Sequence, residues 1–159
     1  MLRSAISARS TGCKRTMSDY SSLFSAAAFK STIRKYCDQY GWAIEEINDG
    51  LAKIKFEMDS GRTQTLFIIR YDTTLEFSVD SVQSFQSEDE VSHRLSTLLL
   101  KKNAEKKVGF WCLEEIDGEL AFSIMHNQEI SLLNAEYFGV IVRILVRECD
   151  EFETAVESM

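Results

Sequence analysis

The residues in this sequence that could do chemistry are its histidines, its cysteines and several groups of acidic residues. His93 and His126 belong to separate predicted elements, a helix and a strand end. A nucleophile pair of either histidine with Cys112 or Cys149 is an open alternative, because such partners meet only in the folded chain. Each of these two cysteines shares a face with apolar residues, which is typical of small buried hydrophobic side chains rather than of reactive thiols.

Acidic residues form three groups: Glu45-Glu46, Glu114-Glu115, and Glu148 with Asp150 and Glu151. Paired carboxylates can perform acid–base chemistry or bind a cation, but carboxylates at strand ends and on helix surfaces usually form solvated faces. The sequence contains neither of the glycine-rich phosphate-binding motifs GxGxxG and GxxxxGK[ST], and no CxxC pair that would indicate zinc. We therefore predict no catalytic residue, no cofactor and no metal.

The composition indicates a soluble, acidic, globular protein. The chain has 159 residues, of which 45% are hydrophobic and 11% aromatic, enough to build the core of one domain. Its formal charge is −7, which argues against nucleic acid as a partner. Arg143 and Arg147 interrupt the most apolar stretch, so no segment reaches the roughly 20 apolar residues of a membrane helix. Scattered cysteines fit reduced thiols, and hence a cytoplasmic location.

The first residues differ from the rest of the chain. Residues 1–18 are predicted to be a basic, Ser-rich leader that is disordered and lies outside the fold, and residues 19–159 to be a single α+β domain. Residues 1–16 contain four basic and no acidic side chains, a composition also found in organellar transit peptides. An organellar location is therefore the alternative to the cytoplasm. Met17 is a plausible second start of translation.

Hydrophobic periodicity predicts one helix followed by four strands. The helix spans Ser21 to Tyr40 and ends at Gly41, since glycine readily takes the left-handed conformation that closes a helix. The strands are Trp42–Ile47, Leu51–Asp59, Thr63–Tyr71, and one from Leu75 that has a bulge or ends near Val82. Turn signals separate them at Asn48-Asp49-Gly50, Ser60-Gly61-Arg62 and Asp72-Thr73-Thr74. Apolar residues on both faces of the third strand predict a central position.

The second half of the chain is predicted to be a helix, a hairpin and a long final helix. Ser87-Glu88-Asp89-Glu90 has the pattern of a capping box that starts a helix. Strands Val108–Glu115 and Glu119–Met125 follow, joined by Asp117-Gly118. The final helix, Asn134 to Glu153, has one core-facing stripe: Phe138, Ile141, Val142, Leu145, Cys149 and Phe152. A second stripe, Leu133, Tyr137, Val140 and Ile144, predicts that its first half is buried on two sides.

The element order is therefore α-β-β-β-β-α-β-β-α. Strands joined by turns of two or three residues must be antiparallel, so the predicted fold is an α+β domain with an antiparallel sheet and flanking helices.

The stretch from Leu98 to Glu153 resembles the C-terminal half of the YbjN-like family, whose fold is shared with type III secretion chaperones. The matching features are a helix ending in Leu-Leu-x-x-Asn (Leu99, Leu100, Asn103), a short strand, the Asp-Gly hairpin and a long last helix closing with Asp150. The resemblance implies a type III secretion chaperone-like fold that often forms homodimers. The resemblance also implies the kind of domain that, in the secretion chaperones, holds extended polypeptide against apolar patches. It implies no catalytic residue.

The function predicted from these observations is a non-enzymatic, chaperone-like or protein-binding domain with a polypeptide client. A small enzyme using a cysteine or an acidic site is the alternative. Surplus apolar surface also predicts a homodimer, because twofold pairing is a common way to bury such a patch. The candidate partner or dimer surface comprises Leu100, Phe110, Trp111, Val140 and Ile144.

Overall fold

The fold described here is a computed structural model, which describes residues 25–159. The first described helix is α2, Ala26–Tyr40. The predicted start of this helix, Ser21, lies outside the described residues. The Ser25 side chain accepts a hydrogen bond from the Ala28 amide, which caps the helix. Gly41 ends it in the left-handed conformation, with φ at 69°, as predicted. The leader and the proposed domain start likewise lie outside the described residues.

Four antiparallel strands follow in a meander: β1 Ile44–Ile47, β2 Leu51–Glu57, β3 Thr63–Tyr71 and β4 Thr74–Phe85. The β1–β2 turn is held by Asn48, whose Oδ1 accepts from the amides of Gly50 at 3.0 Å and Leu51 at 2.9 Å. Strand β3 is internal, as predicted, but only one of its faces is fully covered. Leu66 and Ile68 are buried, whereas Phe67 on the other face is half-buried.

Strand β4 continues past the predicted irregularity, with its register shifted between Asp80 and Ser84. The helix predicted to begin at Ser87 does not begin there. Residues Glu88–Glu90 form a single 3-10 turn without a side-chain cap from Ser87, and Val91 is extended. The helix, α3, spans His93–Glu105 and is capped by Ser92, whose hydroxyl accepts from the Leu95 amide. The prediction of a capping box at Ser87 is therefore wrong, and Ser92 caps the helix instead.

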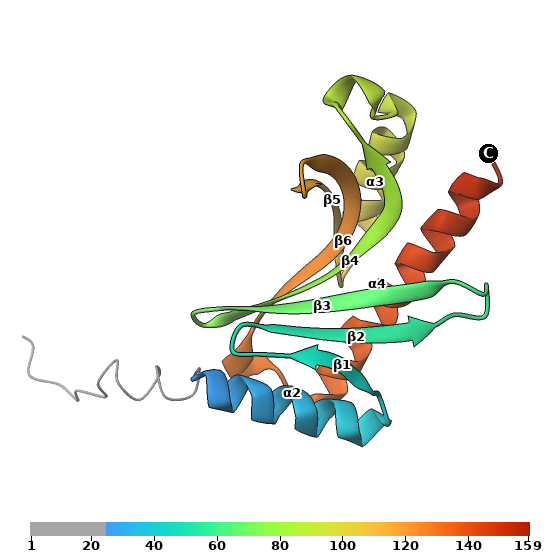
Figure 1. Cartoon of the computed structure of the whole chain (residues 1–159). Helices are drawn as coiled ribbons and strands as arrows, with labels where there is room; N and C mark the ends of the chain where they lie inside the picture. The colour runs from blue at the N-terminus through green and yellow to red at the C-terminus, as the bar shows by residue number, and fades with distance from the viewer. Residues whose placement is uncertain (1–24) are drawn as a thin grey trace, which may run out of the picture.

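Strands β5, Phe110–Ile116, and β6, Glu119–Glu129, form the predicted hairpin. Its turn residues Asp117 and Gly118 both have positive φ, 52° and 87°, as a tight type I′ turn requires. Strand β6 pairs with β4, so β5 lies at the edge of a six-stranded antiparallel sheet in the order β1-β2-β3-β4-β6-β5. The fold is thus α+β with the predicted element order. Figure 1 shows β4, β6 and β5 curling away from the plane of β1 to β3.

Helix α4, Ala135–Glu157, provides the core against the sheet. Every residue of its predicted core-facing stripe is buried. Of the second stripe, Leu133 is buried before the helix starts, while Tyr137, Val140 and Ile144 are half-buried. Helix α2 packs beside the first half of α4, as Figure 1 shows. Two side chains of α2, Tyr36 and Tyr40, donate hydrogen bonds to main-chain oxygens at the start of α4.

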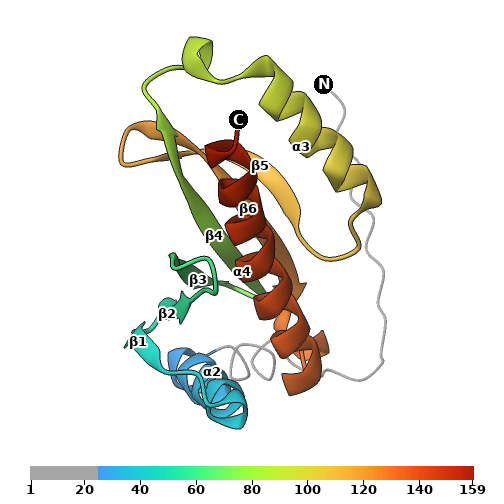
Figure 2. The same ribbon diagram turned by 90° about the vertical axis from the view of Figure 1, so that its right-hand side faces the viewer.

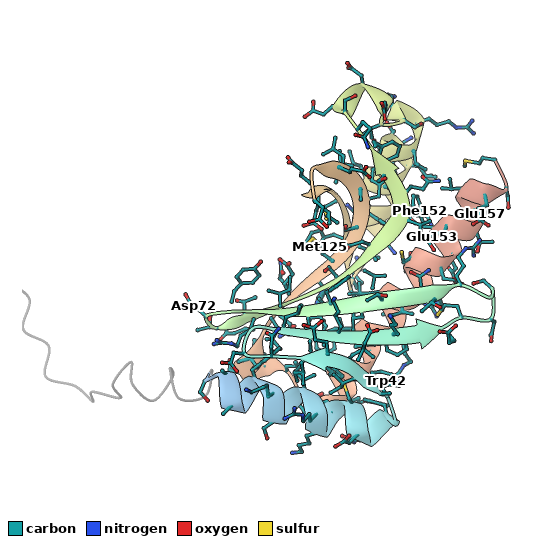
Figure 3. The ribbon with its side chains drawn as sticks, viewed as in Figure 1. Trp42, Asp72, Met125, Phe152, Glu153 and Glu157 are labelled. Carbon is teal, nitrogen blue, oxygen red and sulfur yellow. The ribbon has the colours of Figure 1, made fainter. Side chains whose placement is uncertain are left out.

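The second half of α4 is attached to the sheet through a buried carboxylate, Glu153 (Figure 3). One of its oxygens accepts from the Val82 amide at 2.8 Å, within the irregular part of β4. The other accepts from the Gln64 side chain at 2.6 Å. Arg62 lies beside this network and pairs with Asp150 and Glu157 on the same helix. A buried charge with these partners is satisfied, and it fixes the helix relative to β3 and β4.

Within residues 25–159, no helix is both long enough and apolar enough to span a membrane.

Candidate polypeptide-binding surface

The five residues predicted to form a partner surface do not lie together. Leu100 on α3 and Phe110 on β5 are exposed, with 67% and 38% of their surface accessible. Trp111 is 3% exposed and packs on Phe152, with ring centroids 4.7 Å apart, so its assignment to an open surface is corrected. Val140 and Ile144 are half-buried on α4. The prediction missed Leu98, which is 43% exposed on a different side of α3 from Leu100.

Helix α3 is attached to the body by buried leucines along one face and by polar contacts at its C-terminal end. The Asn103 side chain bridges to β5, donating to the Trp111 carbonyl at 2.9 Å and accepting from its amide at 2.7 Å. Lys106 pairs with Glu148 of α4 at 2.5 Å. Leu95 and Leu99, one turn apart, supply the buried contacts of α3. Asn103 belongs to the Leu-Leu-x-x-Asn pattern in the sequence, and the bidentate contact gives that pattern a structural role.

The part of helix α3 from His93 to Lys101 forms one wall of a groove of about 630 Å³, which we call the α3 groove. The end of β4 and the end of α4 form its other walls, and Figure 2 shows that end of α4 next to α3. Its apolar lining comes from all three elements: Phe85, Leu95, Leu98, Val156 and Met159. The volume lies in the range of ligand-binding clefts, and an apolar lining is typical of surfaces that bind polypeptide.

The charged residues that line the α3 groove are basic, and its other polar residues, Gln83, Ser92 and Thr97, are neutral. His93, Arg94 and Lys101 line it, and no aspartate or glutamate does among the residues that the structure describes. Within residues 25–159, the side chains of Arg94 and Lys101 make no hydrogen bond or ion pair. These cations lie beside an apolar floor in a chain whose formal charge is −7. The groove therefore differs in charge from the protein as a whole.

The cysteines have the surroundings of structural thiols. Cys37 and Cys149 are fully buried, and burial raises the pKa of both, that of Cys37 to about 12. Cys112 is half-buried, and burial, followed by the charges of Glu114, Asp80 and Glu76, raises its pKa to about 12. These thiols are protonated at neutral pH and are poor nucleophiles in that form.

His126, predicted to lie at a strand end, lies within β6, and its ring contacts Gly109 and Tyr137 rather than a cysteine. Its Nδ1 lies 3.3 Å from the Gly109 amide, which donates to it, and its Nε2 lies 3.4 Å from the Tyr137 hydroxyl. Burial lowers the pKa of His126, so its ring is neutral at pH 7. His93 is exposed on α3 and lines the groove. Across residues 25–159, no hydrogen bond joins a cysteine to a histidine.

Most of the acidic groups noted in the sequence face basic side chains. Glu45 and Glu46 pair with Lys55 and Lys53 across the β1–β2 hairpin. The α4 acids Glu148, Asp150 and Glu151 pair with Lys106, Arg62 and Arg147. No group of three or more metal-ligating side chains that could hold an ion occurs in the described part of the chain. These clusters act as surface ion pairs.

Asp80 and Glu76 lie on the face of the sheet that α4 does not cover. The Ser123 hydroxyl donates to Asp80 Oδ1 at 2.8 Å. Burial raises the pKa of Asp80, while this hydrogen bond opposes the shift. Burial also raises the pKa of Glu76, with smaller effects from Glu114 and Asp80. The charged forms of these carboxyls are therefore held at some cost in solvation.

No protein-family model matches this sequence, and no curated protein is significantly similar to it. Among solved structures, the fold is similar to that of YbjN from E. coli, a candidate transcription regulator. The similarity covers 80% of this chain and 90% of that chain, with a TM-score of 0.59 and 16% sequence identity. The chain thus has a YbjN-like fold, as the resemblance in its sequence predicted.

Proposed function

We propose that this protein is a non-enzymatic, chaperone-like domain that binds a segment of another polypeptide in the α3 groove. The observation that supports the proposal is the groove itself: an apolar floor built by three elements, with basic side chains that have no partner within residues 25–159. Apolar grooves beside a helix commonly accept side chains from one face of an amphipathic segment. The YbjN-like fold is compatible with a protein-binding role.

We propose that the chain also pairs with a second copy, through a surface separate from the α3 groove. Strand β5 is an edge strand within residues 25–159, because β6 is the one described strand that pairs with it. It exposes Phe110 on one face and Leu113 on the other, and Leu100 is exposed on the neighbouring helix. Edge strands with exposed apolar residues favour association, and twofold pairing buries the same patch on both copies. Free thiols suit a reducing cytoplasm, where we place this function.

Paired substitutions on α3 separate the two proposals. Leu98→Asp places a charge in the groove, and Leu100→Asp places the same charge on another side of the same helix. We expect Leu98→Asp to weaken binding of fluorescent amphipathic peptides at least tenfold, because the groove loses the apolar contact of Leu98. The new carboxylate would also lie one helical turn from Arg94 and from Lys101, where it can pair with the cations of the same wall. Leu100→Asp should retain peptide binding. Circular dichroism should confirm that both variants fold, and equal binding by both would contradict the assignment of the groove.

Light scattering coupled to gel filtration tests the dimer. The native chain should elute with twice its 18.2 kDa mass, and Leu100→Asp should shift it toward the monomer. A native chain that remains monomeric at high micromolar concentration would contradict the pairing without affecting the peptide-binding test.

A further inference from the structure

We infer that the segment bound in the α3 groove is acidic as well as amphipathic, with carboxylates placed beside its apolar anchors. This inference rests on the proposed function, because it names the chemistry of the partner at the same site. It commits to a polypeptide segment, and an anionic lipid or fatty acid is a competing outcome of the test.

The first step is the position of the unpaired cations. Arg94 and Lys101 are seven residues apart on α3, so they lie on one side of the helix about two turns, or roughly 10.5 Å, apart. Leu98, between them in sequence, contributes to the same groove wall. A ligand whose apolar side chains contact Leu98 must therefore place its flanking residues near Arg94 and Lys101.

The second step is that the described lining of the groove contains no carboxylate. Glu88, Asp89 and Glu90 form the 3-10 turn before α3, but they are exposed and lie outside that lining. Glu157, the last residue of α4, is labelled in Figure 3. Its carboxylate is paired with Arg62 at the β2–β3 turn. No carboxylate lines the groove among the described residues. A basic partner would bring like charges together there, whereas carboxylates would form new ion pairs at the rim.

The third step is the end of the helix. His93 and Arg94 are the first residues of α3, a helix of 13 residues, and both line the groove. The dipole of the helix favours negative charge at this end, in the same direction as the Arg94 side chain. The apolar floor would then supply affinity, and the charges would supply selectivity among amphipathic segments.

The experiment uses three fluorescent peptides with identical leucines at positions i, i+3, i+4 and i+7. Their remaining exposed positions carry glutamate, glutamine or lysine. We expect the full chain to bind the glutamate peptide about tenfold more tightly than the glutamine peptide, and the lysine peptide most weakly, since two rim pairs act together. Raising the salt to 1 M should remove most of this difference, because the screening length falls to about 3 Å.

Charge reversal provides the decisive comparison. Arg94→Glu with Lys101→Glu should invert the order, so that the lysine peptide binds more tightly than the glutamate peptide. Arg34→Glu with Lys35→Glu on α2 makes the same change in net charge away from the groove and should retain the original order. If this control inverts the order equally, net charge rather than the groove selects the ligand, and the inference is wrong.

Other outcomes distinguish the inference from the proposed function. Equal binding of all three peptides, still lost in Leu98→Asp, would overturn the acidic preference and leave the polypeptide groove intact. Failure of every peptide to bind would overturn both. Binding of dodecanoate, lost in Leu98→Asp, with no binding of any peptide, would assign the groove to an anionic amphiphile and overturn both.

Discussion

Replacement of Gly139 by alanine should destabilise the protein, although alanine is the better helix former. A Cβ at this position of α4 would lie 2.5 Å from Oη and 2.8 Å from Cε2 of Tyr40, too close for real contacts. The Tyr40 ring must therefore move. Its hydroxyl donates a 2.9 Å hydrogen bond to the Ala135 carbonyl. Its ring stacks on Trp42, which Figure 3 labels, with the ring centroids 4.6 Å apart. The Arg143 guanidinium lies 5.1 Å from the centroid of the Tyr40 ring.

The magnitude follows from these contacts. The hydrogen bond contributes about 1 kcal/mol, the aromatic pair about 0.5–1.5 kcal/mol and the cation–π contact about 0.5–1 kcal/mol. Losing all three costs about 2–3.5 kcal/mol, and the higher helix propensity of alanine returns about 1 kcal/mol. We therefore expect Gly139→Ala to lower the free energy of unfolding by about 1–2.5 kcal/mol.

Urea unfolding of a double-mutant cycle with Tyr40→Ala tests this reasoning. Without the ring, Gly139→Ala should stabilise the protein by about 1 kcal/mol, so the sign of its effect should reverse between the two backgrounds. Stabilisation by the same amount in both backgrounds would refute close packing of Tyr40 on Gly139.

Three further predictions concern the core and the ionisable groups. Phe138→Ala should lower the free energy of unfolding by about 3–5 kcal/mol, because Phe138 is fully buried. Val140→Ala should lower it by clearly less, because Val140 is half-buried. Equal losses in denaturant titrations would contradict this difference in burial between the two faces of α4. Because burial raises the pKa of Asp80 in the folded chain, stability falls as the pH rises through its ordinary and then its raised value. Asp80→Asn should therefore raise the melting temperature at pH 7 but not at pH 3, and an equal shift at both would contradict this origin. The Cys112 thiol should react with iodoacetamide far more slowly than a free cysteine at pH 8, because its pKa is about 12, and labelling at the free rate in the folded chain would contradict that value.

The sequence predicted those parts of the fold that depend on neighbouring residues. The turns at Asn48 and Asp117-Gly118 are determined by side-chain and backbone preferences within a few residues, and both occur where expected. The start of α3 failed because Ser87 and Ser92 are both acceptable caps locally. Extended Val91 and the buried positions of Leu95 and Leu99 select Ser92, and that choice depends on tertiary packing.

The candidate site could be predicted only in part for the same physical reason. Leu100 and Phe110 were recognised as surplus apolar residues from periodicity within single elements. The α3 groove needs three separate stretches, around Phe85, Leu98 and Val156, to converge, and no local pattern encodes that convergence. The burial of Trp111 depends likewise on Phe152, which is distant in sequence.

The buried carboxylate of Glu153 also bears on errors during folding. A shift of β4 by one residue would turn its side chains to the opposite face and move the Val82 amide away from Glu153. The misaligned chain would then leave a charge in the core with one of its partners missing, which is more costly than the loss of an ordinary apolar contact. Glu153 thus penalises incorrect strand alignment more than it adds to the stability of the correct one.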